Sequence, residues 1–191
     1  MAVSYEPIKA VRTLNGVGMP AMLRVEEGAS KTFKLGVPLT LSSGQVQECA
    51  FGGSELVYGV SAEAASNLTA AGTSEPAYSE GAPINQASAK TIPVGARMRD
   101  GKCGLYLANG QTVFSAMLKD GQVFTQALIS STRYELEKDG TSGLWFIDPT
   151  NSGTNDEHAV NVVGVDPSSP NTAAGGARVF FIFNSSARYH V

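Results

Sequence analysis

Residues 36–65 read GVPLTLSSGQVQECAFGGSELVYGVSAEAA, and apolar residues alternate there with small polar ones on both sides of a Ser-Ser-Gly turn. Before the turn, three apolar residues share one face at a period of two residues: Val37, Leu39 and Leu41. After a Gly-Gly pair, three more are expected to share a face: Leu56, Tyr58 and Val60. Short strands separated by glycine-containing turns are typical of a small barrel or sandwich, so we predict an all-β fold.

The same pattern recurs toward the C-terminus and divides the chain into two β regions. The first region is 31–61, and the second, a main β-sandwich or barrel region, is 92–191. In the second region, the pairs Asp120-Gly121 and Asp139-Gly140 each stand between strand-like runs and predict hairpins. The run VFFIF at 179–183 is apolar on both faces, which predicts a strand that is covered on both sides. The pattern fits either one barrel or two subdomains.

Two segments fall outside these regions. Residues 1–30 have weak periodicity and are interpreted as an extended N-terminal arm that reaches toward another subunit, with one edge strand at 22–25. Residues 62–91 are rich in Ala, Ser and Gly. A stretch of that length with few large apolar residues predicts a surface loop or a linker, and we expect a subdomain boundary there.

The composition limits the kinds of partner. The chain has 191 residues, of which 16% are charged, and a formal net charge of −3. An average domain has about 25% charged residues, so the surface is expected to be poor in charge and suited to permanent contact with neighbours. Lys and Arg form no cluster that could follow a phosphate backbone, which disfavours a nucleic-acid partner. Because the sequence has neither a long apolar run nor an apolar signal core, we expect a soluble protein without a membrane partner.

The sequence contains no constellation of residues that is typical of an enzyme or a metal site. Asp156, Glu157 and His158 stand together in one loop, but their spacing matches no zinc or calcium motif, and a solvated turn explains them. Cys49 and Cys103 are interpreted as two reduced, buried thiols. We therefore expect no catalytic residue, no metal and no cofactor, and we interpret the protein as a non-enzyme.

Trp145 allows two interpretations. It lies in the run LWFI at 144–147, where alternate side chains must point to opposite faces. The favoured interpretation places the indole in the core or at a subunit contact. The alternative is a sugar-stacking platform in a carbohydrate-binding β-sandwich module, and this alternative requires that Trp145 is exposed to solvent.

The order of these features resembles that of the capsid decoration, or cement, proteins of tailed bacteriophages. In many of these proteins a segment of the type G-x-P-V-x-L-x-x-G-x-V is followed by a strand of the type x-G-V-A. Here GVPL at 36–39 and GVSA at 59–62 occupy those places. The resemblance covers most of residues 31–191 and rests on short motifs and their order, and the segment 62–91 departs from it.

The resemblance implies a structural virion protein that binds the outer surface of a phage capsid and stabilises contacts between major capsid subunits. It implies the major capsid protein as partner, self-association as a dimer or trimer, and a place on the virion after synthesis in the host cytoplasm. The residues expected to make capsid or subunit contacts are Met22, Leu23, Val25, Val37 and Leu39. A tail, baseplate or head-fibre component is the alternative within virion structure.

Overall fold

The computed structural model of this chain describes residues 4–16, 18–28, 31–50, 52, 55–65, 102–130, 132–152, 158–172 and 176–189. Within these ranges the strands are β1 (Lys9–Thr13), β2 (Met22–Glu26), β3 (Pro38–Ser42), β4 (Gln45–Glu48), β5 (Gly59–Ser61), β6 (Lys102–Leu107), β7 (Thr112–Met117), β8 (Tyr134–Lys138), β9 (Trp145–Ser152), β10 (Ala159–Val165) and β11 (Arg178–Phe183). The helical elements are two short 3-10 turns, η1 (Gln126–Leu128) and η2 (Ser185–Ala187). The predicted all-β fold is confirmed.

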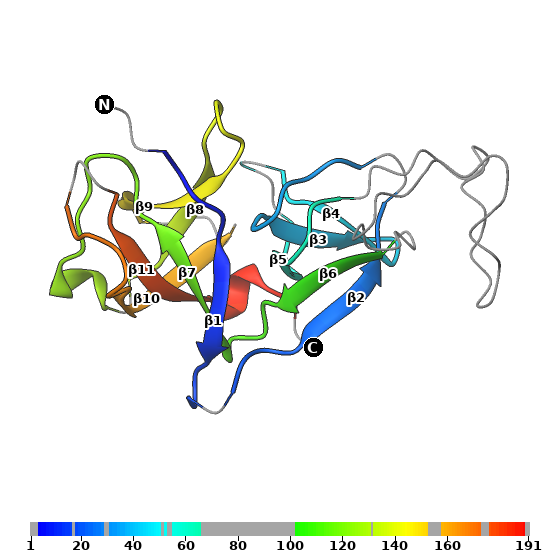
Figure 1. Cartoon of the computed structure of the whole chain (residues 1–191), viewed down its shortest axis with the longest axis horizontal. Helices are drawn as coiled ribbons and strands as arrows, with labels where there is room; N and C mark the ends of the chain where they lie inside the picture. Colours follow the sequence, from blue (N-terminus) through cyan, green and yellow to red (C-terminus); the bar gives the residue numbers. More distant parts are fainter. Residues whose placement is uncertain are drawn as a thin grey trace, which may run out of the picture.

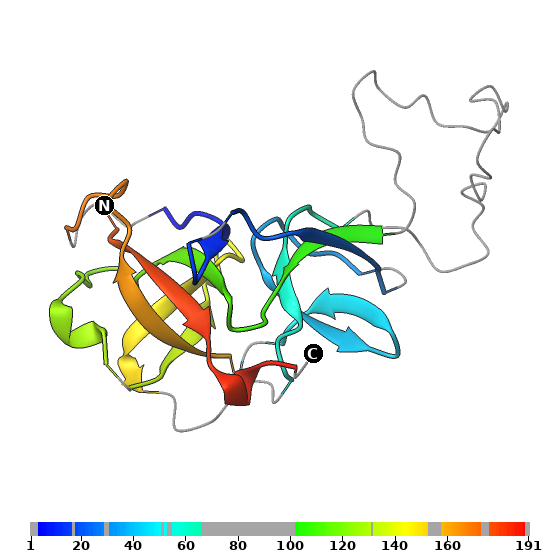
Figure 2. The ribbon, with the colours of Figure 1, turned by 90° about the horizontal axis from the view of Figure 1, so that it is seen from below.

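The strands form two antiparallel sheets that lie side by side (Figures 1 and 2). One sheet has the order β2-β6-β5-β3-β4, and the other has the order β1-β7-β11-β10-β8-β9. Each sheet curls so that two strands near opposite ends of its order come into contact. These are β2 and β4 in the first sheet, and β7 and β9 in the second. We therefore call β2–β6 the N-terminal barrel and β7–β11 the C-terminal barrel, with β1 added to the outer edge of β7.

Each barrel is closed by one parallel contact just beyond the end of its first strand. In the N-terminal barrel, Glu27 bridges Val46, and the next backbone N–H donates to the Val46 carbonyl at 2.9 Å. In the C-terminal barrel, Leu118 bridges Ile147, and the next backbone N–H donates to the Ile147 carbonyl at 2.8 Å. The two closures therefore use the same contact between the first and third strands of each barrel.

The two barrels share one architecture. In both, the strands taken in chain order follow each other around the ring as first, fifth, fourth, second and third. The pairing register also matches over part of each ladder, and bulges in the β8–β9 and β10–β11 ladders of the C-terminal barrel shift it elsewhere. Equivalent cross-strand pairs are Leu41–Val46 and Leu136–Ile147, Gly59–Leu107 and Val160–Phe183, and Leu23–Leu105 and Phe114–Phe181. The chain is thus an internal structural repeat of two five-stranded barrels.

The barrels do not follow the predicted regions 31–61 and 92–191. β6, from the second region, completes the N-terminal barrel, and β1, from the predicted arm, joins the sheet of the C-terminal barrel. The predicted linker 62–91 follows β5, and its residues from 66 onward lie outside the described residues. Because the next described strand, β6, belongs to the N-terminal barrel, this segment lies between two strands of one barrel and not between the two barrels.

The predicted arm, residues 1–30, is built into both sheets. β1 pairs with β7, β2 pairs with β6, and both are outermost strands, so the predicted edge strand at 22–25 is confirmed. The segment also contributes to the core, because Ile8 is buried in it. The Ile8 N–H donates to the Gly36 carbonyl at 3.2 Å, which also ties this segment to the N-terminal barrel.

A buried arginine holds the segment that precedes β1. The guanidinium of Arg178 donates to Glu6 Oε2 at 3.0 Å, to the Pro7 carbonyl at 3.2 Å and to Ser115 Oγ at 3.0 Å. The Ser115 hydroxyl donates in turn to Asp166 Oδ2 at 2.7 Å. Burial lowers the pKa of Arg178, and the carboxylates of Glu6 and Asp166 oppose this effect. These contacts hold the segment before β1 on the C-terminal barrel, although the Glu6 side chain is 54% exposed and solvent screens its ion pair with Arg178.

One of the two predicted hairpins is absent. Asp139-Gly140 joins β8 to β9 as predicted. Asp120-Gly121 forms a turn, but the chain then enters η1, because β8 is not a neighbour of β7 in the ring. After this turn, the backbone of Phe124 pairs with a side chain and not with a strand. The Phe124 N–H donates to the side chain of Asn171 at 2.7 Å, and the Asn171 amide donates to the Phe124 carbonyl at 3.0 Å.

The predicted shared face of Leu56, Tyr58 and Val60 is also incorrect in part. Val60 is buried in β5, but Leu56 is exposed and its neighbour Val57 is buried in its place. The reason lies near the C-terminus: the Val57 N–H donates to the Ala187 carbonyl at 2.8 Å, so the segment after η2 covers this side. The backbone before Gly59 is therefore not part of the regular strand.

β11 forms the centre of the C-terminal barrel. Val179, Phe181 and Phe183 alternate along it and are buried, and the rings of Phe181 and Phe183 both contact Phe114 at centroid distances of 5.7 and 5.4 Å. On the other face, Phe180 is half-buried under the guanidinium of Arg12, 5.7 Å from the ring centroid. The predicted coverage of both faces is thus complete on the inner face and partial on the outer one.

This difference predicts unequal effects of two substitutions in the same strand. Phe181→Ala should lower the free energy of unfolding by about 3–5 kcal/mol, because it leaves a cavity among buried aromatic rings. Phe180→Ala, the matched control, should cost distinctly less because the ring is only half-buried. Urea unfolding of the two variants measures both values. Equal losses would contradict the assignment of faces.

Candidate contact surface

The five residues predicted to contact a capsid or a subunit lie in two different environments. Val37 and Leu39 are completely buried in the core of the N-terminal barrel, so their side chains cannot contact a partner, and this part of the prediction is wrong. The alternation of apolar residues showed which side chains share a face, and that face is the inside of the barrel. Met22 and Leu23 are exposed at 42% and 37%, and Val25 is half-buried.

β2 is therefore the part of the prediction that lies at the surface. Successive side chains of a strand point to opposite faces, so exposure of both Met22 and Leu23 means that neither face of β2 is covered there. Met19, just before the strand, is 69% exposed and extends the apolar surface. We call Met19, Met22 and Leu23 the β2 strip. Met19 was not among the predicted contacts, although the apolar run MPAML at 19–23 contained the signal.

The charged residue at the centre of β2 points away from the open edge. Arg24 donates to Glu63 Oε2 at 3.1 Å and to the Lys102 carbonyl at 3.0 Å, both on the side of β6. Its charge is therefore balanced within the chain. The β2 strip keeps an apolar character, although one of its neighbours is an arginine.

The two motifs that carry the resemblance lie on paired strands. Pro38 is opposite Val60 in the β3–β5 ladder. A Cβ at Gly36, which has φ +72°, would lie 2.6 Å from the Ile8 carbonyl oxygen, and one at Gly59 would lie 2.6 Å from the Tyr106 carbonyl oxygen. Both glycines are therefore required by close backbone approach. In this protein the motif residues serve packing.

Trp145 belongs to the junction of the two barrels. Its side chain is completely buried, and its indole N–H donates to Glu48 Oε1 of the N-terminal barrel at 2.8 Å. The same carboxylate accepts an ion pair from Lys138 at 2.7 Å. The predicted core location is confirmed. The sugar platform built on an exposed Trp145 is excluded, because the condition that it requires is not met.

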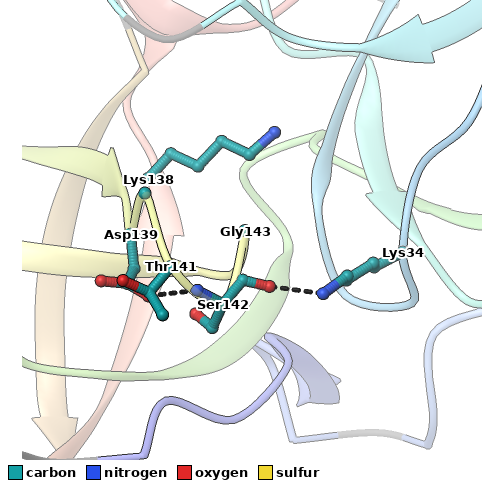
Figure 3. A pocket seen from close by; sticks show the side chains of 7 residues that line it. Lys34, Lys138, Asp139, Thr141, Ser142 and Gly143 are labelled. Atoms are coloured by element: carbon teal, nitrogen blue, oxygen red, sulfur yellow. Dashed lines mark hydrogen bonds between the residues drawn. The ribbon is translucent and has the colours of Figure 1, made fainter.

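A shallow hollow lies where the β8–β9 hairpin meets the N-terminal barrel (Figure 3). Its lining includes Lys34, Asp139 and Ser142, and the Lys34 ammonium donates to the Ser142 carbonyl across it. Hydrogen bonds from Ser142 hold the pKa of Asp139 below its usual value. These polar groups thus bind one another and hold the hairpin against the neighbouring barrel.

His158 differs from its predicted setting. Asp156 and Glu157 lie outside the described residues, but His158 is 2% exposed, so the interpretation as a solvated turn is wrong for this residue. Its ring contacts Trp145 edge to face at a centroid distance of 5.3 Å, and its Nε2 has no hydrogen-bond partner among the described residues. Burial lowers the pKa of His158, and the carboxylate of Glu55 opposes this effect.

The cysteines match their prediction. Cys49 and Cys103 are both free and buried. Burial raises the pKa of Cys103 to about 12 and raises that of Cys49 well above its usual value. Since the thiolate is the reactive form, both thiols are poor nucleophiles near neutral pH.

Among the described residues, no three His, Cys, Asp or Glu side chains lie close enough together to hold a metal ion. The same part of the chain contains no helix with the length and apolar character needed to cross a membrane.

Comparisons with protein families, curated proteins and solved structures find no match to this chain.

The buried histidine predicts a pH dependence of stability. Because folding lowers the pKa of His158, the unfolded chain takes up its proton first as the pH falls through about 6.5, and stability should decrease between pH 7 and 5. For each tenfold decrease that folding causes in the proton affinity of His158, the free energy of unfolding should fall by about 1.4 kcal/mol over this pH range. Urea unfolding at several pH values measures it.

The matched variants are His158→Asn and His190→Asn. Asparagine tolerates the positive φ of 52° at position 158. His158→Asn should flatten the pH profile between pH 7 and 5, and His190→Asn should leave it unchanged. The reverse pattern would show that burial of His158 does not control this titration.

Proposed function

We propose that this protein is a structural virion protein that binds the outer surface of a tailed-phage capsid and stabilises contacts between major capsid subunits. The observation that carries the proposal is the β2 strip, three neighbouring apolar side chains that are exposed in a protein with 16% charged residues. Clustered exposed apolar side chains can mark a surface that binds another protein. The major capsid protein is the proposed partner.

The fold suits a structural role that depends on the shape of the protein and on its surface contacts. Two barrels joined by Trp145, Glu48 and Lys138 form one continuous body with a single core cluster. Such a body can extend over a junction between neighbouring subunits. Outermost strands can add main-chain hydrogen bonds to a partner by β-augmentation, and side chains on both faces then provide specificity.

Several further features belong to the proposal. The protein acts on the outside of the head after synthesis in the host cytoplasm, and it self-associates as a dimer or trimer. It has no catalytic role and needs no cofactor. The resemblance in motif order and the charge-poor composition support this proposal together with the β2 strip.

Co-sedimentation with undecorated phage heads tests the proposal. The wild-type chain should co-sediment with heads, and Leu23→Lys should weaken binding by about tenfold or more, as loss of a central apolar contact commonly does. The matched control is Val123→Lys, because Val123 is also 37% exposed but lies outside the β2 strip. Failure of the wild type to bind heads, or equal loss in both variants, would contradict the proposal.

The apolar character of the strip also predicts the response to salt. Screening acts mainly on exposed charges, so raising the ionic strength from low to high salt should change head binding only slightly. Binding isotherms at several salt concentrations measure this. A steep fall in affinity with salt would indicate a contact made by ion pairs elsewhere on the surface.

A further inference from the structure

The internal repeat allows β2 to be compared with its counterpart β7. The two strands hold equivalent places in their barrels, since Leu23 pairs with Leu105 as Phe114 pairs with Phe181. In β7, all six residues are buried. In β2, by contrast, four of the five residues are exposed. One position in the shared architecture is therefore covered in one barrel and uncovered in the other.

The cover of β7 includes a strand that β2 lacks. β1 pairs antiparallel with β7, placing Ala10 opposite Phe114 and Arg12 opposite Val113. By the register of the repeat, the equivalent residues of β2 are Leu23 and Met22. Among the described residues, no strand pairs with β2 on this side, and the contact of Glu27 with Val46 lies beyond its end. In the described part of the chain, β1 therefore covers the edge of β7, and no described strand covers the equivalent edge of β2.

We infer that the open edge of β2 binds the β2 edge of a second copy of this chain, forming a two-fold antiparallel ribbon between two N-terminal barrels. The inference deepens the self-association in the proposed function, although its evidence is independent of the capsid. β1 cannot easily leave to fill the position, because Arg178 holds the residues that precede it. Two such edges, one from each copy, can pair their backbone N–H and carbonyl groups with each other, so no further strand is needed.

Charge and side-chain pattern favour this occupant. The stretch equivalent to the β1-bound part of β7 is 21–24, and two-fold antiparallel pairing centred on Met22 places Met22 opposite itself and Leu23 opposite Ala21 of the other copy. Arg24 then lies opposite Pro20, so no like charges face each other. The outer edge of β1 is a poorer partner, because Lys9 and Arg12 are exposed on it and charged edge residues oppose strand pairing.

The expected dimer is weak. A ribbon of four residues per copy buries less than a standard interface of about 1,600 Å². The dimer population should therefore depend on protein concentration. Attachment of many copies to one particle would increase that population by raising the local concentration.

Sedimentation velocity of the purified full chain, from micromolar to millimolar concentration, tests the inference. The wild type should shift from monomer to dimer, and Met22→Lys should weaken dimerisation about tenfold or more. Val123→Lys, with a comparably exposed apolar residue in the C-terminal barrel, should behave as wild type. Urea unfolding of each variant confirms that the fold is unchanged, as expected for exposed positions.

A second measurement gives a positive signal for the register. The Met22→Cys chain alone should form an intermolecular disulfide under mild oxidation, because the two-fold ribbon places this position opposite itself in the other copy. Native Cys49 and Cys103 are buried and should not compete. The Val123→Cys chain is the control and should not cross-link.

The outcomes separate this inference from the proposed function. A wild type that stays monomeric at all concentrations overturns the inference, and if Met22→Lys then weakens head binding, the occupant of the edge is a head protein. A dimer that is insensitive to Met22→Lys also overturns it. A β2-dependent dimer that does not bind heads supports the inference and contradicts the proposed function.

Discussion

Closure of each sheet on itself is the constraint on which this structure depends. A ring of five strands closes only if its first strand meets its third, and the contacts of Glu27 with Val46 and of Leu118 with Ile147 provide this in the two barrels. The closing contact uses only the end of the first strand. The rest of its outer edge stays open, and unpaired strand edges tend to bind other strands. What covers that edge therefore decides how each barrel interacts with its surroundings.

The chain covers one edge and leaves the other open. β1 precedes β2 in the sequence, yet it pairs with β7 in the distant barrel, where Arg178 fixes the residues before it. Hydrogen bonds from Ser168 and Ser115 and the charge of Arg178 outweigh the effect of burial and hold the pKa of Asp166 below its usual value, so the cluster carries opposite charges near neutral pH. This arrangement joins the two barrels into one body and leaves β2 as the exposed apolar strand.

Local patterns in the sequence predicted the strands but not their arrangement. Period-two alternation located β3, a continuous apolar run located β11, Asp139-Gly140 located a hairpin, and the apolar setting of Trp145 indicated burial. The repeat was not apparent because equivalent positions share only apolar character or nothing at all, as with Gly59 and Val160. The contact prediction failed at Val37 because alternation does not show which face is covered. At Met22 and Leu23 the side chains are exposed in the described structure, so these positions stay available as predicted contacts.

The central claim is that the edge of β2 is the contact surface that the fold leaves open. Amide hydrogen exchange of residues 21–26 tests it most directly, because pairing of a strand edge protects backbone N–H groups whatever the partner. The account predicts that exchange in this stretch slows when the protein is concentrated or mixed with undecorated heads, while the equivalent stretch of β7 is protected throughout. Unchanged exchange in β2 under both conditions, with protection appearing on another face, would contradict it.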